Sequence, residues 1–168
     1  MQAKVSIIMG STSDMPIMKQ AAEFLNDMQI PFEINALSAH RTPEDVSEFA
    51  CSAKARGIEV IIAGAGMAAH LPGVIASMTT VPVIGVPIKA SLNGWDAILS
   101  IIQMPPGIPV ASVGLNAAKN AGILAAQILA LKDENLMNRF IDFKNSLKNK
   151  IIKANKDLSE IKYKYKVN

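Results

Sequence analysis

Three residues whose types could do chemistry, Ser38, His40 and Arg41, stand in a short polar stretch between an apparent strand and an apparent helix. The imidazole of His40 can donate or accept a proton near neutral pH, and the guanidinium of Arg41 can hold a phosphate through two hydrogen bonds. A helix N-terminus repels cations, so this pair is favourable just before Thr42 only if an anion binds there. We therefore predict an anion site beside an acid or base. An exposed pair in an ordinary loop is the alternative.

A second polar stretch, residues 10–14, places Gly10, Ser11, Ser13 and Asp14 at the start of another expected helix. Backbone N–H groups and hydroxyls at such a position suit a phosphate, with Ser13 as the candidate N-cap. The stretch lacks the Gly-Lys-Ser/Thr of a P-loop and the G-x-G-x-x-G of a dinucleotide site. An ordinary helix cap is the alternative reading.

A third stretch joins a Gly-Ala-Gly segment, residues 64–66, to His70 and Leu71. The glycines allow a backbone to approach a ligand closely. His70 fits either a polar lining group or a buried histidine with satisfied hydrogen bonds. Because no carboxylates accompany His40 and His70 at ligand spacing, we expect no metal.

The elements that must position these stretches alternate along the chain. Apolar runs predict strands at 5–9, 32–36, 60–63, 81–86 and 108–113, and helical patterns start near 14, 42, 73, 97 and 117. Thr42 is the expected hydroxyl cap of the second helix. This alternation predicts a three-layer α/β sandwich with a central parallel sheet of about five strands, of the flavodoxin or Rossmann kind. The three polar stretches should then meet at the carboxyl edge of that sheet.

Residues 1–131 form the expected α/β domain, and residues 132–168 a C-terminal helix and basic tail. The tail carries one apolar stripe and ten Lys or Arg against five Asp or Glu. We expect the stripe, which has no more of this domain to cover, to pack on a neighbouring subunit. Its charges are read as a solvated face rather than a nucleic-acid site, because no recognition motif accompanies them. The stripe comprises Leu136, Phe140, Phe143, Leu147, Ile151, Ala154 and Leu158.

Composition restricts the class of protein further, because it bears on disorder, membrane insertion and secretion. Of 168 residues, 50% are hydrophobic and 18% charged, which favours one folded domain over disorder. Residues 60–88 contain no charged side chain, but prolines and glycines interrupt the run, so buried parallel strands explain it better than a membrane span. The start of the chain shows no leader pattern and Cys51 is the single cysteine, so we expect a cytoplasmic protein. Cys51 is expected to be a small core residue rather than a nucleophile.

The three polar stretches alone indicate a site for a phosphate-bearing small molecule, with a histidine positioned for proton transfer. A receiver-type signalling domain would need acids after strands one and three and a lysine after strand five. This chain has Gly10-Ser11, Gly64-Ala65 and Gly114-Leu115 there, so that class is excluded. A non-enzymatic, flavodoxin-like nucleotide carrier stays open, although aromatic residues are few and Trp95 is the only tryptophan.

Six motifs, in order along about residues 5–131, carry a family resemblance. They are Met9-Gly10-Ser11-Thr12-Ser13-Asp14, Ser38-Ala39-His40-Arg41-Thr42-Pro43, Ala63-Gly64-Ala65-Gly66 with Ala68-Ala69-His70-Leu71-Pro72-Gly73, Pro82-Val83-Ile84-Gly85-Val86-Pro87, Ser100-Ile101-Ile102-Gln103-Met104-Pro105 and Asn120-Ala121-Gly122. The sequence closely resembles the class I N5-carboxyaminoimidazole ribonucleotide mutases of purine biosynthesis, a family also called the catalytic subunit of phosphoribosylaminoimidazole carboxylase.

The resemblance implies a cytoplasmic homo-octamer without metal or organic cofactor, acting after an ATP-dependent N5-carboxyaminoimidazole ribonucleotide synthetase. The implied reaction moves a carboxylate from N5 to C4 of the aminoimidazole ribonucleotide by decarboxylation and recarboxylation. His40 matches the histidine that protonates the carbamate nitrogen and later removes the C4 proton. The other matches are Ser11, Ser13, Ser38 and Arg41 for the phosphate, Asp14 for the ribose, and Ala65, Gly66, His70 and Leu71 for the base and CO2 pocket.

A related class carboxylates aminoimidazole ribonucleotide directly with CO2, and it is the alternative function. That class is expected to have Lys-Gly where this chain has Arg41-Thr42. The Arg-Thr-Pro form therefore favours the mutase. Met67 stands where the family usually has a small residue, which is a departure in the third motif.

Overall fold

Five parallel strands form the middle layer of the molecule. The computed structural model describes all residues from Met1 to Asn168. The strands lie in the order β2-β1-β3-β4-β5, and all neighbours are parallel. Their bounds are Val5–Met9 (β1), Phe32–Ala36 (β2), Val60–Gly66 (β3), Val83–Ile88 (β4) and Ala111–Ser112 (β5).

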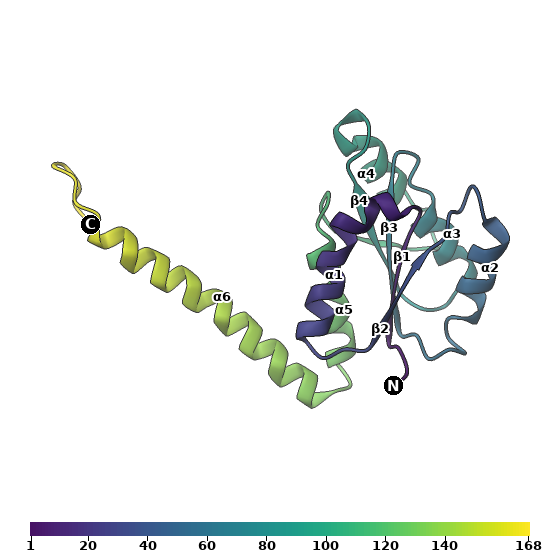
Figure 1. Cartoon of the computed structure of the whole chain (residues 1–168), viewed down its shortest axis with the longest axis horizontal. Coiled ribbons are helices and arrows are strands. Elements are labelled where there is room, and N and C mark those ends of the chain that lie inside the picture. Colours follow the sequence, from purple (N-terminus) through teal and green to yellow (C-terminus); the bar gives the residue numbers. More distant parts are fainter.

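Helices cover both faces of this sheet, as Figure 1 shows. One face packs against α1 and α5, and the other against α2, α3 and α4. The predicted three-layer α/β fold with a central parallel sheet is therefore confirmed. The helices are α1 (Met15–Asp27), α2 (Pro43–Ser52), α3 (Leu71–Met78), α4 (Trp95–Ile102), α5 (Ala118–Ala130) and α6 (Glu134–Glu160), with short 3₁₀ turns η1 (Thr12–Asp14) and η2 (Leu92–Gly94).

The central strands are apolar on both faces because each face has its own core. In β1, Val5 and Ile7 join the cluster under α1 and α5, whereas Ile8 joins the cluster under α2, α3 and α4. Strands β1 and β4 are buried throughout, and so is β3 as far as Ala65. This two-sided burial explains why residues 60–88 contain no charge. No helix is both long enough and apolar enough to cross a membrane.

Strand bounds differ from the predicted ones at three places. Strand β3 continues through the Gly-Ala-Gly segment to Gly66, because these residues pair with β4 from Val86 to Ile88. Strand β4 ends at Ile88 rather than at the predicted residue 86, so it contains Pro87. The carbonyl of Pro87 accepts at 2.8 Å from the N–H of Asn116, which lies beyond the last residue of β5. No neighbouring strand therefore needs the N–H that proline lacks. Strand β5 itself has only two residues, far fewer than the predicted 108–113.

Cys51 is exposed, so the prediction that it belongs to the core is wrong. The buried side of α2 is taken by Val46, Phe49 and Ala50, which follow helical spacing toward the sheet. Cys51 falls outside that stripe, and its Sγ lies 3.7 Å from the carbonyl oxygen of Met78.

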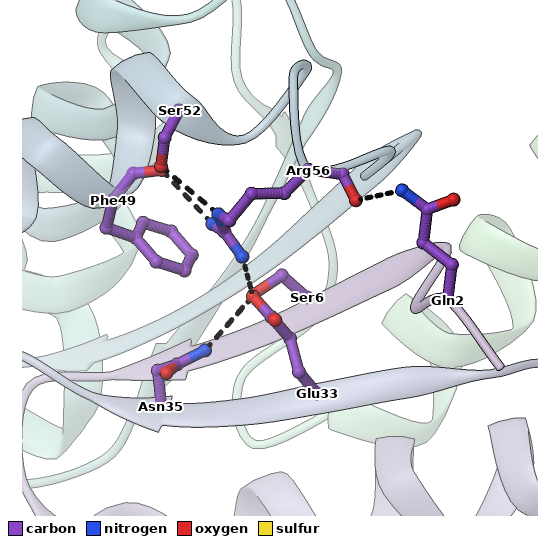
Figure 2. Close-up of polar contacts among 7 residues, drawn as sticks. All are labelled: Gln2, Ser6, Glu33, Asn35, Phe49, Ser52 and Arg56. Atoms are coloured by element: carbon purple, nitrogen blue, oxygen red, sulfur yellow. Dashed lines mark hydrogen bonds and ion pairs between the residues drawn. The ribbon is translucent and has the colours of Figure 1, made fainter.

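A polar cluster joins β2 to the end of α2 (Figure 2). Arg56 donates to the Glu33 carboxylate at 2.5 Å, to the carbonyl of Phe49 at 3.2 Å and to the hydroxyl of Ser52 at 3.1 Å. Its guanidinium also lies 5.0 Å from the centre of the Phe49 ring. The Ser6 hydroxyl, which is fully buried in β1, donates to the same carboxylate at 2.9 Å. The cluster thus ties β1 and β2 to the end of α2, and β2 and α2 are the elements that flank the loop carrying His40.

The C-terminal helix α6 leaves the body of the molecule, as Figure 1 shows. Its first turns pack on α1 and α5, where Leu136 and Phe140 are buried and the Phe143 ring meets Phe24 edge-on at 5.0 Å. Farther along, the predicted stripe is uncovered in this single chain, and Ile151 is 71% exposed. The predicted boundary at residue 131 lies in the turn between α5 and α6.

Candidate active site at the carboxyl edge of the sheet

A cavity of about 440 Å³ opens where β1, β3 and β2 end. The loops that follow these strands supply most of its wall, as expected for parallel strands in this order. All the residues predicted from the sequence to form a site line it: Ser11, Ser13, Asp14, Ser38, His40, Arg41, Ala65, Gly66, His70 and Leu71. The volume is within the usual range for a small-molecule site.

The loop after β2 is held in shape by its own hydroxyls. The Thr42 hydroxyl accepts from the N–H of Ser38 at 3.0 Å and lies 3.2 Å from the Ser38 carbonyl, to which it donates. The Ser38 hydroxyl accepts from the N–H of Arg41 at 3.3 Å. Thr42 occupies the N-cap position of α2 but makes no side-chain cap hydrogen bond, so its predicted capping role is wrong. Its hydroxyl instead closes the turn that presents His40 and Arg41.

Arg41 brings a positive charge that no carboxylate neutralises. Its Nη2 donates to the carbonyl oxygen of Gly10 at 2.8 Å, which ties the loop after β2 to the loop after β1. The ion pairs of the structure are Lys4 with Glu59 and Arg56 with Glu33, and neither involves Arg41. A free guanidinium before the N-terminus of α2 attracts an anion to the cavity.

The loop after β1 adds hydroxyls and a carboxylate. Ser11, rather than the predicted Ser13, is the cap: its hydroxyl accepts from the N–H of Ser13 at 3.3 Å and from the Ser13 hydroxyl at 3.0 Å. Asp14 occupies the N-cap position of α1 without a side-chain cap hydrogen bond. Burial raises the pKa of the Asp14 carboxyl above its ordinary value. Its oxygens remain free to accept hydrogen bonds from a ligand.

The segment after β3 forms the apolar side of the cavity. Ala65 and Leu71 are buried, and Met67 adopts a left-handed φ of 54° that L-residues seldom take. A Cβ on Gly64 would come within 2.4 Å of the Met18 sulfur, and one on Gly66 within 3.0 Å of the Ile88 carbonyl oxygen. Packing against α1 and β4 therefore favours glycine at both positions, whereas the sequence reading attributed them to a close ligand.

Two histidines from separate loops meet at the mouth of the cavity. His40 Nε2 lies 2.8 Å from His70 Nδ1, and the ring planes are nearly perpendicular at 89°. His70 is the N-cap residue of α3 and makes no side-chain cap hydrogen bond. Both side chains are exposed, so of the two alternatives left open for His70 the lining group fits and the buried histidine does not.

Four lining residues were missed by the sequence reading: Ala39, Met67, Ala68 and Ala90. The first three lie between predicted residues in the sequence and carry no distinctive side-chain chemistry. Ala90 comes from the loop after β4, and the rule that loops follow parallel strands to one edge could have found it. No group of three or more His, Cys, Asp or Glu residues is arranged to hold a metal ion.

Comparison with known proteins gives concordant results. The family model described as AIR carboxylase matches residues 4–150. A Thermotoga maritima protein named N5-carboxyaminoimidazole ribonucleotide mutase is 54% identical over 166 residues, which cover 98% of this chain and 97% of that protein. A Pyrococcus abyssi protein of the same name is 57% identical over 86% of this chain and 84% of its own.

The solved structures agree with the sequence relatives. The crystal structure of Treponema denticola PurE matches with a TM-score of 0.84 and 33% identity, over 92% of this chain and 97% of that one. The family match covers most of the chain, including every motif that lines the cavity. This chain belongs to the AIR carboxylase family.

Proposed function

We propose that this chain is an N5-carboxyaminoimidazole ribonucleotide mutase, which converts N5-carboxyaminoimidazole ribonucleotide to 4-carboxy-5-aminoimidazole ribonucleotide in purine biosynthesis. The observation that carries the proposal is one cavity lined by an imidazole, an unneutralised guanidinium, a carboxylate and several hydroxyls. The high identity to relatives named for this activity, over nearly the whole chain, supports the same function.

The substrate has a phosphate at one end and a reactive carbamate at the other. Arg41 attracts the phosphate by charge, and Ser11, Ser13 and Ser38 offer it hydroxyl hydrogen bonds. The Asp14 carboxylate accepts hydrogen bonds from the ribose hydroxyls. Binding of the phosphate and the ribose fixes the position of the aminoimidazole. A reaction at its exocyclic nitrogen and at C4 requires that fixed position.

His40 acts as both acid and base. It gives a proton to the carbamate nitrogen, and the C–N bond then breaks with its electron pair left on that nitrogen, which releases CO2. The C4 carbon attacks the CO2 and forms the new C–C bond. His40 then removes the C4 proton, so it ends in the protonation state in which it began. One residue is enough because the overall reaction neither consumes nor releases a proton.

The CO2 must stay in the cavity between the two steps. The buried side chains of Ala65 and Leu71, with Gly66 and His70 beside them, offer an apolar wall that suits a small neutral molecule. Exclusion of water there keeps CO2 from being lost as bicarbonate.

Assay of the purified protein with each substrate tests the proposal. We expect turnover of N5-carboxyaminoimidazole ribonucleotide and little turnover of aminoimidazole ribonucleotide at low bicarbonate. The opposite result would identify a direct carboxylase. His40→Asn should fold and bind the nucleotide but lose turnover by a factor of roughly 10²–10⁴, as expected for loss of a general acid and base. Near-normal turnover of that variant would remove His40 from the mechanism.

We further propose a cytoplasmic homo-octamer in which residues 132–168 pack on a neighbouring subunit. The exposed apolar side chains of Leu147, Ile151 and Leu158 support this, because a stripe of this kind is stabilised when a partner covers it. The synthetase that makes the labile carbamate is the expected functional partner. Light scattering of the full chain and of a chain that ends at residue 145 tests the assembly. An equal number of subunits per particle for the two chains would contradict the proposed packing.

A further inference from the structure

The contact between His40 and His70 needs a proton in a defined place. Their nearest ring nitrogens, Nε2 of His40 and Nδ1 of His70, are 2.8 Å apart, which is a hydrogen-bond distance. Two imidazole nitrogens can form such a bond only if one carries a hydrogen and the other does not. The contact therefore fixes which nitrogen of His40 remains for other partners.

The proposed role of His40 as an acid decides the direction of this hydrogen bond. An imidazole that is about to give up a proton carries hydrogen on both ring nitrogens, so its Nε2 can only donate. The partner atom, Nδ1 of His70, must then be the acceptor. His70 is well placed for this role because it is fixed at the N-cap position of α3, with φ −77° and ψ −22°.

The other charged groups of the cavity leave this arrangement undisturbed. Arg41 is directed to the carbonyl of Gly10, and Asp14 makes no side-chain hydrogen bond to either imidazole. No carboxylate forms an ion pair with His40 or His70. His70 is consequently the one protein side chain that orients the His40 ring by a hydrogen bond.

We propose that His70 is a positioning residue that accepts a hydrogen bond from His40 Nε2–H, so that His40 exchanges protons with the substrate through Nδ1. The inference rests on the proposed function and deepens it, since the sequence resemblance assigns His70 only to the wall of the pocket. With Nε2–H held by His70, neutral His40 presents a bare Nδ1 as a base. Protonated His40 presents Nδ1–H as an acid, and the ring does not turn between the two steps.

Matched substitutions at His70 separate this role from simple contact with the substrate. In His70→Asn the amide oxygen can stand near the place of Nδ1 and accept from His40. In His70→Gln the amide lies near the place of Nε2, farther from His40, and His70→Leu offers no acceptor. We expect kcat to fall about tenfold in His70→Leu, the loss equivalent to one orienting hydrogen bond, with KM changed by less than about threefold.

The order of the variants is the main readout. We expect His70→Asn to retain kcat within about threefold of the unsubstituted protein and His70→Gln to resemble His70→Leu. A rise in KM at constant kcat in His70→Leu would show that His70 only contacts the substrate. Equal kcat losses in His70→Asn and His70→Leu would also overturn the proposal.

An independent test does not use activity. The chain has only two histidines, so nitrogen-15 imidazole spectra contain two rings, and in His70→Leu only that of His40. Under mildly alkaline conditions, where imidazoles are ordinarily neutral, we expect His40 in the Nε2–H form. That form should weaken into a mixture in His70→Leu and return in His70→Asn. An unchanged tautomer in His70→Leu refutes the hydrogen-bond role, even if the protein proved to catalyse a different reaction.

Discussion

Replacing Arg56 by methionine is expected to lower the free energy of unfolding by about 2.5–3.5 kcal/mol. The ion pair with Glu33, whose side chains are 34% and 32% exposed, contributes about 1 kcal/mol once solvent screening is allowed for. The hydrogen bonds to Phe49 and Ser52 contribute about 0.5–1 kcal/mol each, and the contact with the Phe49 ring about 0.5 kcal/mol. Methionine retains an unbranched apolar stem, so the change isolates the guanidinium.

The other ion pair of the chain provides the control. Lys4 and Glu59 are 2.6 Å apart, but their side chains are 46% and 38% exposed, and the Lys4 ammonium makes no further contact. Lys4→Met should therefore change the free energy of unfolding by about 0–0.5 kcal/mol. Urea denaturation followed by circular dichroism measures both variants under the same conditions and at the same subunit concentration. Equal midpoints for Arg56→Met and Lys4→Met would refute the reasoning.

A pH series with Glu33→Gln sharpens the test. Burial alone would raise the pKa of the Glu33 carboxyl, but the hydrogen bonds from Arg56, Ser6 and Asn35 and the charge of Arg56 lower it below 4.5. A lowered folded pKa adds stability at pH values above 4.5 and loses it as the pH falls through the folded pKa. The stability difference between the unsubstituted chain and Glu33→Gln should therefore be widest near neutrality and narrow in acid. A gap that widened in acid would contradict the sign.

Three further predictions concern the cavity. Arg41→Ala should weaken ribonucleotide binding by about 1.5–3 kcal/mol in calorimetry, whereas Arg139→Ala, which removes a distant arginine, should not; equal affinities would sink the phosphate role. Asp14→Asn should raise the midpoint of unfolding at neutral pH, because burial disfavours the charged carboxyl, and should also weaken nucleotide binding; a lowered midpoint would reverse the argument. Met67→Gly should stabilise the fold by about 1 kcal/mol through relief of the left-handed backbone, and no gain in thermal midpoint would count against strain there.

The sheet and the meeting of its loops could be predicted because both follow from alternation. Apolar runs between helical patterns require parallel strands, and parallel strands send their following loops to one edge. That reasoning brought Ser11, His40 and His70 to one side of the sheet although they are far apart in the sequence. It needed no information on side-chain packing.

Details that depend on packing across elements could not be predicted in the same way. The length of β3 is set by pairing with β4, and the need for Gly64 by the sulfur of Met18 on α1. The Thr42 hydroxyl could cap the helix or bond back to Ser38, and both are local choices of similar energy. The contact of His40 with His70 spans loops that belong to β2 and β3, with β1 between them. A single sequence does not reveal which rotamers meet there.

The length of α6 has a consequence for how order is distributed along the chain. Its 27 residues extend about 40 Å, and only the first turns rest on the domain. Isolated helical segments of the remaining size are marginal in water. In a lone subunit, amide hydrogen exchange should therefore quicken steadily from Phe143 toward the end of the helix, where the Lys166 ammonium binds the last carbonyls. The proposed packing of this helix on a neighbouring subunit therefore predicts that exchange beyond Phe143 slows as the subunit concentration rises.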